Sequence, residues 1–298
     1  MKSDRILVAA LLTCHNRRER TIECLSRLMN QDRLAAPHRS VPCVSLDVIL
    51  VDDGSTDGTA DAVRERFPAV RIVSGPGDLY WAGGMRRAWS AAAGSGPHDA
   101  YLLLNDDTLL TPSALGSLLD TADFARQKHG TPGIAVGSIL DDEGRHHYGG
   151  ALWWRGRGPV IPSGEPMRCD LFNCNATLIS ADAYRVLGGF SDVFTHSMAD
   201  YEYGCRAQRA GVPCYIAGGY IGTCPRNPTP EWLSAETSFR RRWSVIHHPK
   251  GLPPREYRHL CRALYSWRWP FAFVTTYLRI MLPLLRRRIC DAVDGAGR

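Results

Sequence analysis

Short apolar runs alternate with amphipathic segments along the first 110 residues of the chain. Between the runs, apolar residues recur at helical spacing, as in Ile22, Leu25 and Leu28, which is typical of a helix with one buried face. The runs themselves predict four buried strands, at residues 5–13, 48–51, 70–75 and 101–104. Strands that alternate with helices predict an α/β fold with a mostly parallel sheet and helices on both of its faces.

Polar and charged residues follow each of these four strands directly. In open parallel sheets, ligands bind beyond the carboxyl ends of the strands. We therefore expect the four strand exits to form one site at a single edge of the sheet. The exits are residues 13–17, 52–57, 78–87 and 105–107.

The pattern becomes less regular after residue 130. Glycine and proline interrupt it often, and the apolar runs are shorter. It predicts strands at residues 134–140, 175–180 and 212–219, a loop at 153–166, and helices in ADAYRVLGGF and at 201–209.

The chain from Arg240 onward is basic and rich in aromatic residues. It has 13 Lys and Arg against 3 Asp and Glu, whereas the preceding 239 residues have 23 against 27. Arginines and prolines interrupt LYSWRWPFAFVTTYLRIMLPLLRRR, so it lacks the ~20 apolar residues of a spanning helix. Aromatic residues beside arginines favour a helical tail on an anionic membrane surface. The alternative is a helical pair packed on the body of the protein. Because no nucleic-acid-binding module is recognisable, we expect no nucleic acid partner.

Ten cysteines are scattered along the 298 residues without a CxxC pair, which argues against a zinc cluster. The short apolar run near the start leads into a cluster of charge instead of a small-residue cleavage site, so we expect no signal peptide. Reduced thiols and a cytoplasmic location are the corresponding expectations.

The stretch YLLLNDDTLL ends a buried strand on Asn105, Asp106 and Asp107. Mg²⁺ and Mn²⁺ prefer oxygen ligands, and their sites commonly combine one or two carboxylates with phosphate oxygens. Adjacent carboxylates repel each other, and a bound cation would relieve that repulsion. The alternative is a strand-ending turn, which would be preferred if this stretch stood alone.

Two further stretches with paired carboxylates are candidate sites. In VDDGSTDGT, Asp52 and Asp53 could meet a base or a ribose, or they could belong to an ordinary capping loop. In HSMADYEYGCRAQRAG, Asp200 and Glu202 lie near the start of a helix, where the helix dipole favours carboxylates. One of them could instead act as a general base, and Arg206 is spaced to pair with Glu202.

The segment GDLYWAGGMRRAW joins a glycine-containing loop to a helix. Backbone N–H groups of Gly83 and Gly84, together with Arg86 or Arg87, could meet a phosphate or a sugar. The alternative is an ordinary helix start with its arginines in solvent. The segment is neither a GxGxxG dinucleotide loop nor a GxxxxGK[ST] phosphate loop.

Taken together, these stretches resemble the family-2 inverting glycosyltransferases with the GT-A fold, including rhamnosyltransferase-like members. The motifs that support the resemblance are TCHNR, VDDGSTDGT, GDLYWAGG, LLNDDT, GGF and ADYEYGCRA. It covers about residues 5–250 and implies a catalytic domain at 1–250, followed by a basic helical tail at 251–298. It also implies transfer of a sugar from a nucleotide-diphosphate donor to a hydroxyl of a glycan or lipid-linked acceptor.

The resemblance assigns roles to individual residues. Asp107 and Asn105 would bind a divalent cation, Mg²⁺ or Mn²⁺. Asp200 would be the general base, supported by Glu202. The sequence departs from the family pattern at Asn105, where the family's DxD element has its first Asp, and at Ala199, where an acidic residue or Thr often precedes the base. The residues assigned to the nucleotide sugar are Thr13, Asn16, Arg17, Asp52, Asp53, Gly83, Gly84, Arg86 and Asp106.

Three other classes of protein remain as alternatives. A nucleotidyltransferase would have a glycine-rich loop after its first strand, where this chain has TCHNRRER, and a dehydrogenase would also need glycines there. A non-catalytic, membrane-associated scaffold with a sugar-nucleotide site is the third, and carboxylates at three separate places argue against it. Among donors, WAGG resembles the rhamnosyltransferase-like members, which implies dTDP-rhamnose, with a UDP-sugar as the second choice.

Overall fold

The computed structural model describes residues 5–34, 43–154, 158–226, 230–234 and 236–281. The chain forms two compact units. The first comprises Met1–Thr195 and Ala199–Arg226, and the second comprises His196–Met198 and Asn227–Arg298. The resemblance implies a domain boundary at residue 250, which stays a prediction. Helix α7 (Phe239–His247) belongs to the second unit, with the helices that follow it.

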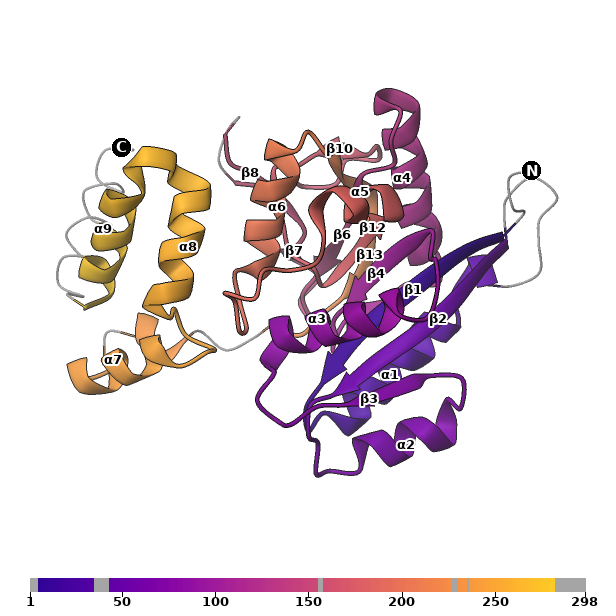
Figure 1. Cartoon of the computed structure of the whole chain (residues 1–298), viewed down its shortest axis with the longest axis horizontal. Helices are drawn as coiled ribbons and strands as arrows, with labels where there is room; N and C mark the ends of the chain where they lie inside the picture. The colour runs from indigo at the N-terminus through magenta and orange to yellow at the C-terminus, as the bar shows by residue number, and fades with distance from the viewer. Residues whose placement is uncertain (1–4, 35–42, 155–157, 227–229, 235, 282–298) are drawn as a thin grey trace. The chain divides into compact units, whose positions relative to one another are not determined.

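A ten-stranded sheet forms the centre of the first unit (Figure 1). Along its main path the strand order is β10-β13-β6-β12-β4-β1-β2-β3; β5 pairs with β13, and β7 pairs with β6. The strands are β1 (Arg5–Cys14), β2 (Cys43–Asp52), β3 (Arg71–Ser74), β4 (Ala100–Leu104), β5 (Leu109–Leu110), β6 (Ile134–Leu140), β7 (His146–Tyr148), β10 (Met167–Arg168), β12 (Ala176–Ser180) and β13 (Cys214–Thr223).

The four strands predicted from the N-terminal pattern are β1 to β4. They are adjacent and parallel, in the order β3-β2-β1-β4. Strand β12 then runs antiparallel to both β4 and β6, and β13 returns parallel to β6. The expected α/β fold with helices on its sheet is therefore confirmed.

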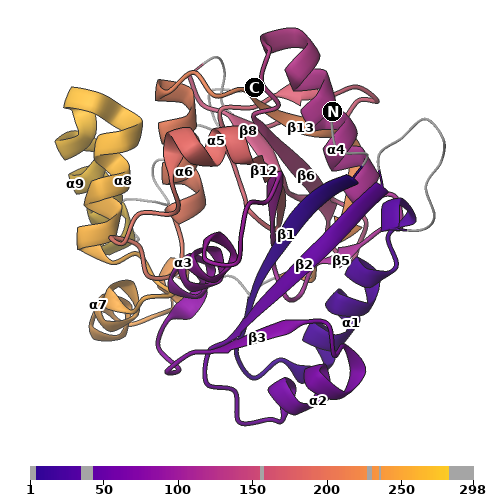
Figure 2. The ribbon, with the colours of Figure 1, turned by 45° about the vertical axis from the view of Figure 1, so that its right-hand side comes forward.

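Among the residues that the structure describes, six α-helices belong to the first unit, together with the 3₁₀ turn η1 (Asp32–Leu34). Helices α1 and α2 lie on one face of strands β1 to β3, and α3 lies on the other (Figure 2). This is the arrangement expected when right-handed crossovers connect parallel strands on both sides of the first strand. The helices are α1 (Arg18–Met29), α2 (Thr59–Arg66), α3 (Tyr80–Ala93), α4 (Ala114–His129), α5 (Ala181–Leu187) and α6 (Ala199–Arg209).

The two faces of the sheet have different cores. On one face, Val8 and Leu12 of β1 join a buried cluster with Leu25 of α1 and Leu118 of α4. On the other face, the indole of Trp89 on α3 contacts the rings of Tyr101 on β4, Tyr184 on α5 and Tyr203 on α6 at 5.1–5.8 Å between centroids. Aromatic packing therefore joins α3, α5 and α6 on this face of the sheet.

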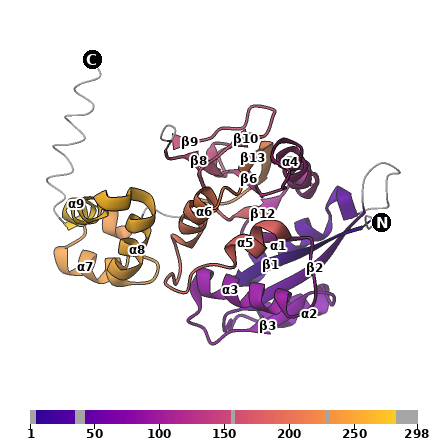
Figure 3. The ribbon, with the colours of Figure 1, turned by 45° about the horizontal axis from the view of Figure 1, so that its top comes forward.

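A small second sheet lies beside the β10–β13 edge of the main sheet (Figure 3). It consists of β11 (Leu171–Phe172), β8 (Gly150–Leu152) and β9 (Gly158–Pro159). The sequence predicts a loop over residues 153–166, and the presence of β9 corrects this prediction. A two-residue strand is too short to produce a hydrophobic period, so the pattern could not indicate it.

The second unit is helical, with the 3₁₀ turns η2 (Glu231–Leu233) and η3 (Ser266–Arg268) and helices α7 (Phe239–His247), α8 (Pro254–Tyr265) and α9 (Trp269–Met281). Helices α8 and α9 pack together as a pair. Within the described ranges, no helix combines the length and the apolar character needed to cross a bilayer. The arginines predicted to lie near a membrane at residues 286–288 are outside the described residues.

Candidate active site

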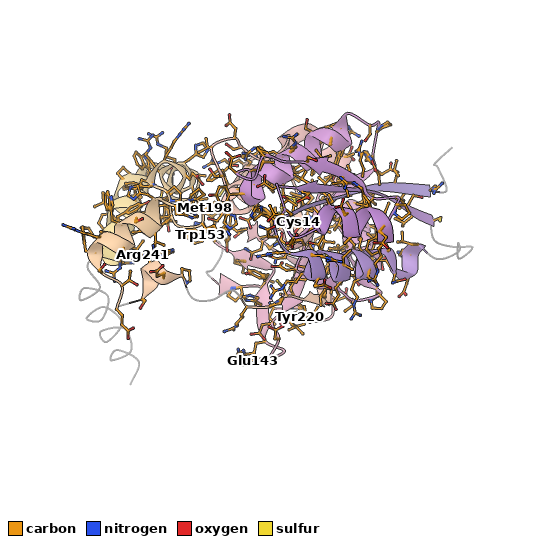
Figure 4. All side chains as sticks on the ribbon, turned by 90° about the horizontal axis from the view of Figure 1, so that it is seen from below. Cys14, Glu143, Trp153, Met198, Tyr220 and Arg241 are labelled. Atoms are coloured by element: carbon orange, nitrogen blue, oxygen red, sulfur yellow. The ribbon has the colours of Figure 1, made fainter. Side chains whose placement is uncertain are left out.

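The four predicted strand exits start next to one another because β3, β2, β1 and β4 are neighbours in the sheet, and Ser74 at the end of β3 pairs with Asp52 at the end of β2. Cys14 at the end of β1 pairs with Asp52 at the end of β2, and Leu11 pairs with Leu103 of β4. The Cys14 side chain is buried among the strands (Figure 4). The segments that follow these strands therefore start from the same edge of the sheet.

Hydrogen bonds join the loop after β1 to the loop after β2. The backbone N–H of Asn16 donates to Ser55 Oγ at 2.9 Å, and Asn16 Oδ1 accepts from the backbone N–H of Thr56 at 2.7 Å. The ring Nδ1 of His15 lies 2.6 Å from the carbonyl oxygen of Asp53. Asn16 reaches this position with a φ of 51°, a conformation that asparagine tolerates better than most residues. Asn16 thus fixes the shape of the predicted nucleotide pocket.

Asp53 holds the segment that leads into α3. Its Oδ1 accepts from the backbone N–H of Gly77 at 2.8 Å, and its Oδ2 accepts from that of Tyr80 at 3.1 Å. The neighbouring Asp52 accepts from the backbone N–H of Ser55 through Oδ1. No described residue donates a hydrogen bond to its Oδ2. Of the two carboxylates assigned to the base or ribose, only Asp52 has a carboxylate oxygen, Oδ2, that accepts no hydrogen bond from a described residue.

Helix α3 approaches β1 closely through its glycines. A Cβ added at Gly84 would overlap the Thr13 side chain, so the absence of a side chain at Gly84 permits the contact. Gly83 lies against Leu79, with less crowding. Arg86 is half-buried and donates from Nη1 to the carbonyl oxygens of Ser191 and Phe194 at 2.9 and 2.7 Å. Arg86 thus holds the loop that follows the GGF motif.

Arg17 connects the first strand exit to the NDD segment. Its Nη1 lies 3.1 Å from Asp106 Oδ1 and 2.6 Å from Asp107 Oδ2, so one nitrogen bridges the two carboxylates. Asp107 Oδ1 also accepts from the thiol of Cys224 at 3.5 Å. Both carboxylates are buried, whereas the Arg17 side chain is 39% exposed. The two carboxylates therefore converge on a single positive charge.

The chemistry of Asp106 and Asp107 fits a divalent cation. Asp106 Oδ2 is buried and has no hydrogen-bond partner among the described residues. Burial raises the pKa of Asp106 to about 6, although the Arg17 guanidinium acts in the opposite direction. No group of three or more His, Cys, Asp or Glu side chains suited to a metal occurs within the described chain. A cation at Asp106 and Asp107 would therefore complete its coordination with oxygens of the donor or with water.

Asn105 differs from the two aspartates in its surroundings. Its Oδ1 accepts from the indole N–H of Trp81 at 2.7 Å, and its backbone N–H donates to the carbonyl oxygen of Asn175 at 3.0 Å. The amide oxygen predicted to bind metal therefore already accepts a hydrogen bond from the first turn of α3. Trp81 also contacts the ring of Phe190, at 5.4 Å between centroids.

Asp200 lies in the first turn of α6 and next to the segment that precedes β12. Its Oδ2 accepts a weak hydrogen bond from Asn173 Nδ2 at 3.5 Å, and its Oδ1 accepts from the backbone N–H of Tyr201 at 2.9 Å. Burial raises the pKa of Asp200 to about 6, and these hydrogen bonds lower it in part. Residues 173–175 therefore contact both Asp200 and, through Asn175, the NDD segment.

Glu202 pairs with Arg206, as its spacing predicts. Arg206 Nε lies 3.0 Å from both carboxylate oxygens of Glu202. The other nitrogens of the guanidinium donate to the carbonyl oxygens of Leu187 and Gly189 at 2.5 and 2.9 Å. Glu202 thus orients an arginine that holds the end of α5, and any catalytic support by Glu202 stays a prediction.

Comparison with known proteins identifies the family of the chain. The family model described as glycosyl transferase family 2 matches residues 10–173, which is more than half of the chain. This chain belongs to glycosyl transferase family 2. The match includes the strand exits from Thr13 to Asp107 and ends before Asp200.

Curated relatives of this family 2 chain come from two strains of Mycobacterium tuberculosis, CDC 1551 / Oshkosh and ATCC 25618 / H37Rv. Both are named N-acetylglucosaminyl-diphospho-decaprenol L-rhamnosyltransferase and are 26% identical to it over 192 residues. The alignment covers 56% of this chain and 62% of each relative, so the chain spans less than two thirds of the relatives' length.

Solved structures share the fold at low identity. S. aureus TarS 1–349 in complex with UDP-GlcNAc has a TM-score of 0.55 and 14% identity, over 90% of this chain and 73% of that chain. GalNAc-T7 with UDP, GalNAc and Mn²⁺ also has a TM-score of 0.55, with 13% identity, over 81% of this chain and 48% of that chain. The expected GT-A fold is confirmed by these similarities.

The sequence of this family 2 chain did not indicate two residues at the site. Asn173 lies between two short strands, and only the fold brings it to Asp200. Trp81 lies within the GDLYWAGG motif, but Asn105, which accepts the hydrogen bond from its indole N–H, is 24 residues away in the sequence. The available signals were a polar residue between two buried runs and a tryptophan near glycines. Neither signal indicates which residue the side chain contacts.

Proposed function

We propose that this chain transfers a sugar, with inversion, from a nucleotide-diphosphate donor to a hydroxyl of a glycan or lipid-linked acceptor. One observation carries the proposal. The segment 173–175 contacts both a carboxylate whose pKa is about 6, that of Asp200, and the strand exit that holds Asp106 and Asp107. The segment 173–175 thus contacts both the candidate base, Asp200, and the strand exit with the candidate diphosphate-binding pair, Asp106 and Asp107.

On the donor side, Thr13, Asn16 and Arg17 would line the nucleotide pocket, and Asp52 would receive a base or ribose group at its free Oδ2. Asp106 and Asp107 would hold Mg²⁺ or Mn²⁺, which supplies positive charge to the leaving diphosphate. The solved structure of GalNAc-T7 contains Mn²⁺ together with UDP, which supports a cation in this role. Arg17, which already lies at both carboxylates, would add its own positive charge beside the diphosphate.

On the acceptor side, Asp200 would take the proton of the attacking hydroxyl. The hydroxyl oxygen forms a bond to the anomeric carbon while the bond from that carbon to the diphosphate breaks, and the electron pair leaves with the diphosphate. The sugar passes through an oxocarbenium-like state, and a single displacement inverts the anomeric carbon. With a pKa of about 6, the Asp200 carboxylate is mostly ionised at pH 7 and can accept this proton.

For the donor we propose dTDP-rhamnose first, because the curated relatives are named L-rhamnosyltransferases and the WAGG motif favours the same sugar. A UDP-sugar is the second choice, since the S. aureus TarS structure contains UDP-GlcNAc. The same relatives' name includes a diphospho-decaprenol, which supports a lipid-linked acceptor. A cytoplasmic location remains part of this proposal.

The test is a panel of dTDP-, UDP- and GDP-sugars with Mn²⁺ or Mg²⁺, a polyprenyl-diphosphate sugar as acceptor, and release of nucleoside diphosphate as the readout. We expect turnover with at least one donor. Asp200→Asn should lower turnover by about 10²–10⁴-fold, the usual contribution of a general base, while binding of the nucleotide persists. Nucleotide binding without turnover in the unaltered protein would favour the non-catalytic scaffold. Full activity of Asp200→Asn would exclude Asp200 as the base.

A further inference from the structure

Four apolar side chains form an exposed stripe along η3 and α9 in the second unit. They are Trp267, Phe271, Val274 and Leu278, and their exposed fractions are 79%, 75%, 51% and 50%. Their spacing of four, three and four residues places them on one side of a helix. We call this set the α9 stripe. Large apolar side chains that are both exposed and contiguous are unusual on a soluble surface and mark an interaction site.

The opposite side of α9 packs against α8 within the second unit. There, the ring of Phe273 lies 4.8 Å from that of Tyr277 and 6.0 Å from that of Tyr257 on α8. The hydroxyl of Tyr257 hydrogen-bonds to Thr276 Oγ1 at 2.8 Å, and Ile280 is buried. The α8–α9 pair is therefore held together by residues outside the stripe.

Exposed arginines lie next to both ends of the α9 stripe. From Tyr257 to Met281 the sequence contains four arginines and no Asp or Glu. Arg268 and Arg279 are exposed next to the two ends of the stripe. The guanidinium of Arg268 lies 5.0 Å from the ring centroid of Trp267, and that of Arg262 lies 4.7 Å from that of Trp269. Arginines that stack on tryptophan suit a boundary between apolar and anionic surroundings.

The apolar stripe and its arginines together indicate which kind of partner binds this surface. A second copy of the same face would bring two positive surfaces together, which is unfavourable. Single-stranded nucleic acid would use the arginines and the aromatic rings, but Val274 and Leu278 offer no stacking surface. An anionic bilayer satisfies both features, because acyl chains accept the apolar side chains and lipid phosphates accept the arginines. At about 1.5 Å per residue, the 13 residues of α9 form a helix roughly 20 Å long that can lie flat in the interface.

We infer that the α9 stripe docks the protein on a membrane that contains anionic lipid, with α9 parallel to the surface and Arg268 and Arg279 at the lipid phosphates. This inference does not depend on the identity of the donor or the acceptor.

The test is co-sedimentation of the full chain with vesicles of phosphatidylcholine alone and with vesicles that also contain phosphatidylglycerol, at low and high salt. The variant Phe271→Ser/Leu278→Ser removes the centre and the end of the stripe. The matched control, Ile161→Ser/Val186→Ser, removes two exposed apolar residues from the first unit. Circular dichroism and thermal unfolding of all three proteins establish that each is folded.

We expect the unaltered protein and the control to bind vesicles containing phosphatidylglycerol and to bind less at high salt, because screening weakens the arginine–phosphate attraction. The stripe variant should partition at least about tenfold more weakly, since it loses two large apolar side chains from the acyl region. Binding by the stripe variant that equals the control, or no binding to either vesicle by the unaltered protein, would overturn the inference. So would a concentration-dependent dimer that the stripe variant loses, because the occupant would then be a second copy.

Discussion

At the scale of single residues, Arg17 is the side chain whose surroundings differ most from those the sequence indicated. The resemblance placed it at the nucleotide, and the structure shows it paired with both carboxylates of the NDD segment. Two buried carboxylates with one cationic partner form a unit that is sensitive to the loss of that partner, since an unpaired buried charge is costly.

We expect Arg17→Met to lower the free energy of unfolding by about 1–3 kcal/mol, a range reduced from that of a fully buried pair because Arg17 is partly exposed. Adding Mn²⁺ to the metal-free protein should restore more stability to Arg17→Met than to the unaltered protein, because the cation would replace the missing charge at Asp106 and Asp107. Urea denaturation with and without Mn²⁺ measures both effects. Arg18→Met is the control, since Arg18 is exposed and pairs only loosely with Glu19 at 3.8 Å. Equal losses in the two variants would show that the bridge contributes nothing.

Asn173 leads to a prediction about pH. The pKa of Asp200 is raised by burial and lowered in part by the hydrogen bond from Asn173. A base must be ionised to act, so the rate should rise with pH through about 6. Asn173→Ala removes a donor to the ionised form, so the pKa rises further and the ascending limb of the rate profile moves to higher pH. The rate at pH 8 should fall much less than the rate at pH 6.

The measurement for Asn173→Ala is kcat against pH, with Thr177→Val as the control. Thr177 Oγ1 donates to the carbonyl oxygen of Asn173 at 3.0 Å and makes no described hydrogen bond to Asp200. A uniform loss of rate at every pH, with the limb unmoved, would indicate that Asn173 has only a structural role.

Stability should depend on pH through Asp200 as well. A carboxyl whose pKa is higher in the folded than in the unfolded protein stabilises the fold below its unfolded value, near 4, and this contribution is lost as pH rises through about 6. Asp200→Asn removes the cost of the buried charge. The variant should therefore unfold at a higher temperature than the unaltered protein at pH 8, and the difference should shrink by pH 4.

Residue types at the site could be predicted from the sequence more readily than their partners. Asp106, Asp107 and Asp200 stand out because carboxylates that follow a buried run or begin a helix are visible in the pattern. The engagement of Asp53 with Gly77 and Tyr80 was not visible, because a capping role and a ligand role use the same residue types.

At the scale of elements, helix α3 forms one side of the predicted site. Its N-terminal segment is held by Asp53, its Trp81 contacts Asn105, and its Gly84 lies against Thr13. Strands β1 to β4 could be predicted because each is a sustained apolar run between helices. Strands β5, β9, β10 and β11 could not, because two residues give no period.

Gly84→Ala tests the contact between α3 and β1. The added methyl group would overlap the buried Thr13 side chain, and overpacking of this kind costs about 1–3 kcal/mol. Nucleotide affinity should fall as well, because Thr13 is assigned to the pocket. The control is Gly94→Ala at the end of the same helix, where φ is −78° and an added methyl group meets only ordinary contacts. Unfolding in urea and nucleotide titration compare the two, and equal stability would show that α3 can shift without cost.

At the scale of the whole molecule, charge and chemistry divide between two parts of the chain. The first 239 residues are slightly acidic and contain every residue assigned to the donor and the acceptor, whereas the remainder is basic and contains the α9 stripe. The sequence predicted this asymmetry from composition. The boundary at residue 250 followed from the extent of the resemblance and stays a prediction, and α7 lies in the second unit.

This division predicts that a nucleotide stabilises the protein through the first unit alone. A ligand at 100 times its dissociation constant adds about 2.7 kcal/mol to the free energy of unfolding. We therefore expect dTDP or UDP to raise the unfolding temperature, and to raise it further when Mn²⁺ is present, because Asp106 and Asp107 would hold the cation and the diphosphate together. Chelation with EDTA should remove the additional increase.

Two variants separate the contributions to this increase in unfolding temperature. Asp107→Asn should lack the Mn²⁺-dependent part and keep the part due to the base and ribose, whereas Phe271→Ser/Leu278→Ser should respond like the unaltered protein. An increase that is the same with Mn²⁺ and with EDTA would show that nucleotide binding does not require the cation. A response lost in the stripe variant would show instead that the second unit takes part in donor binding.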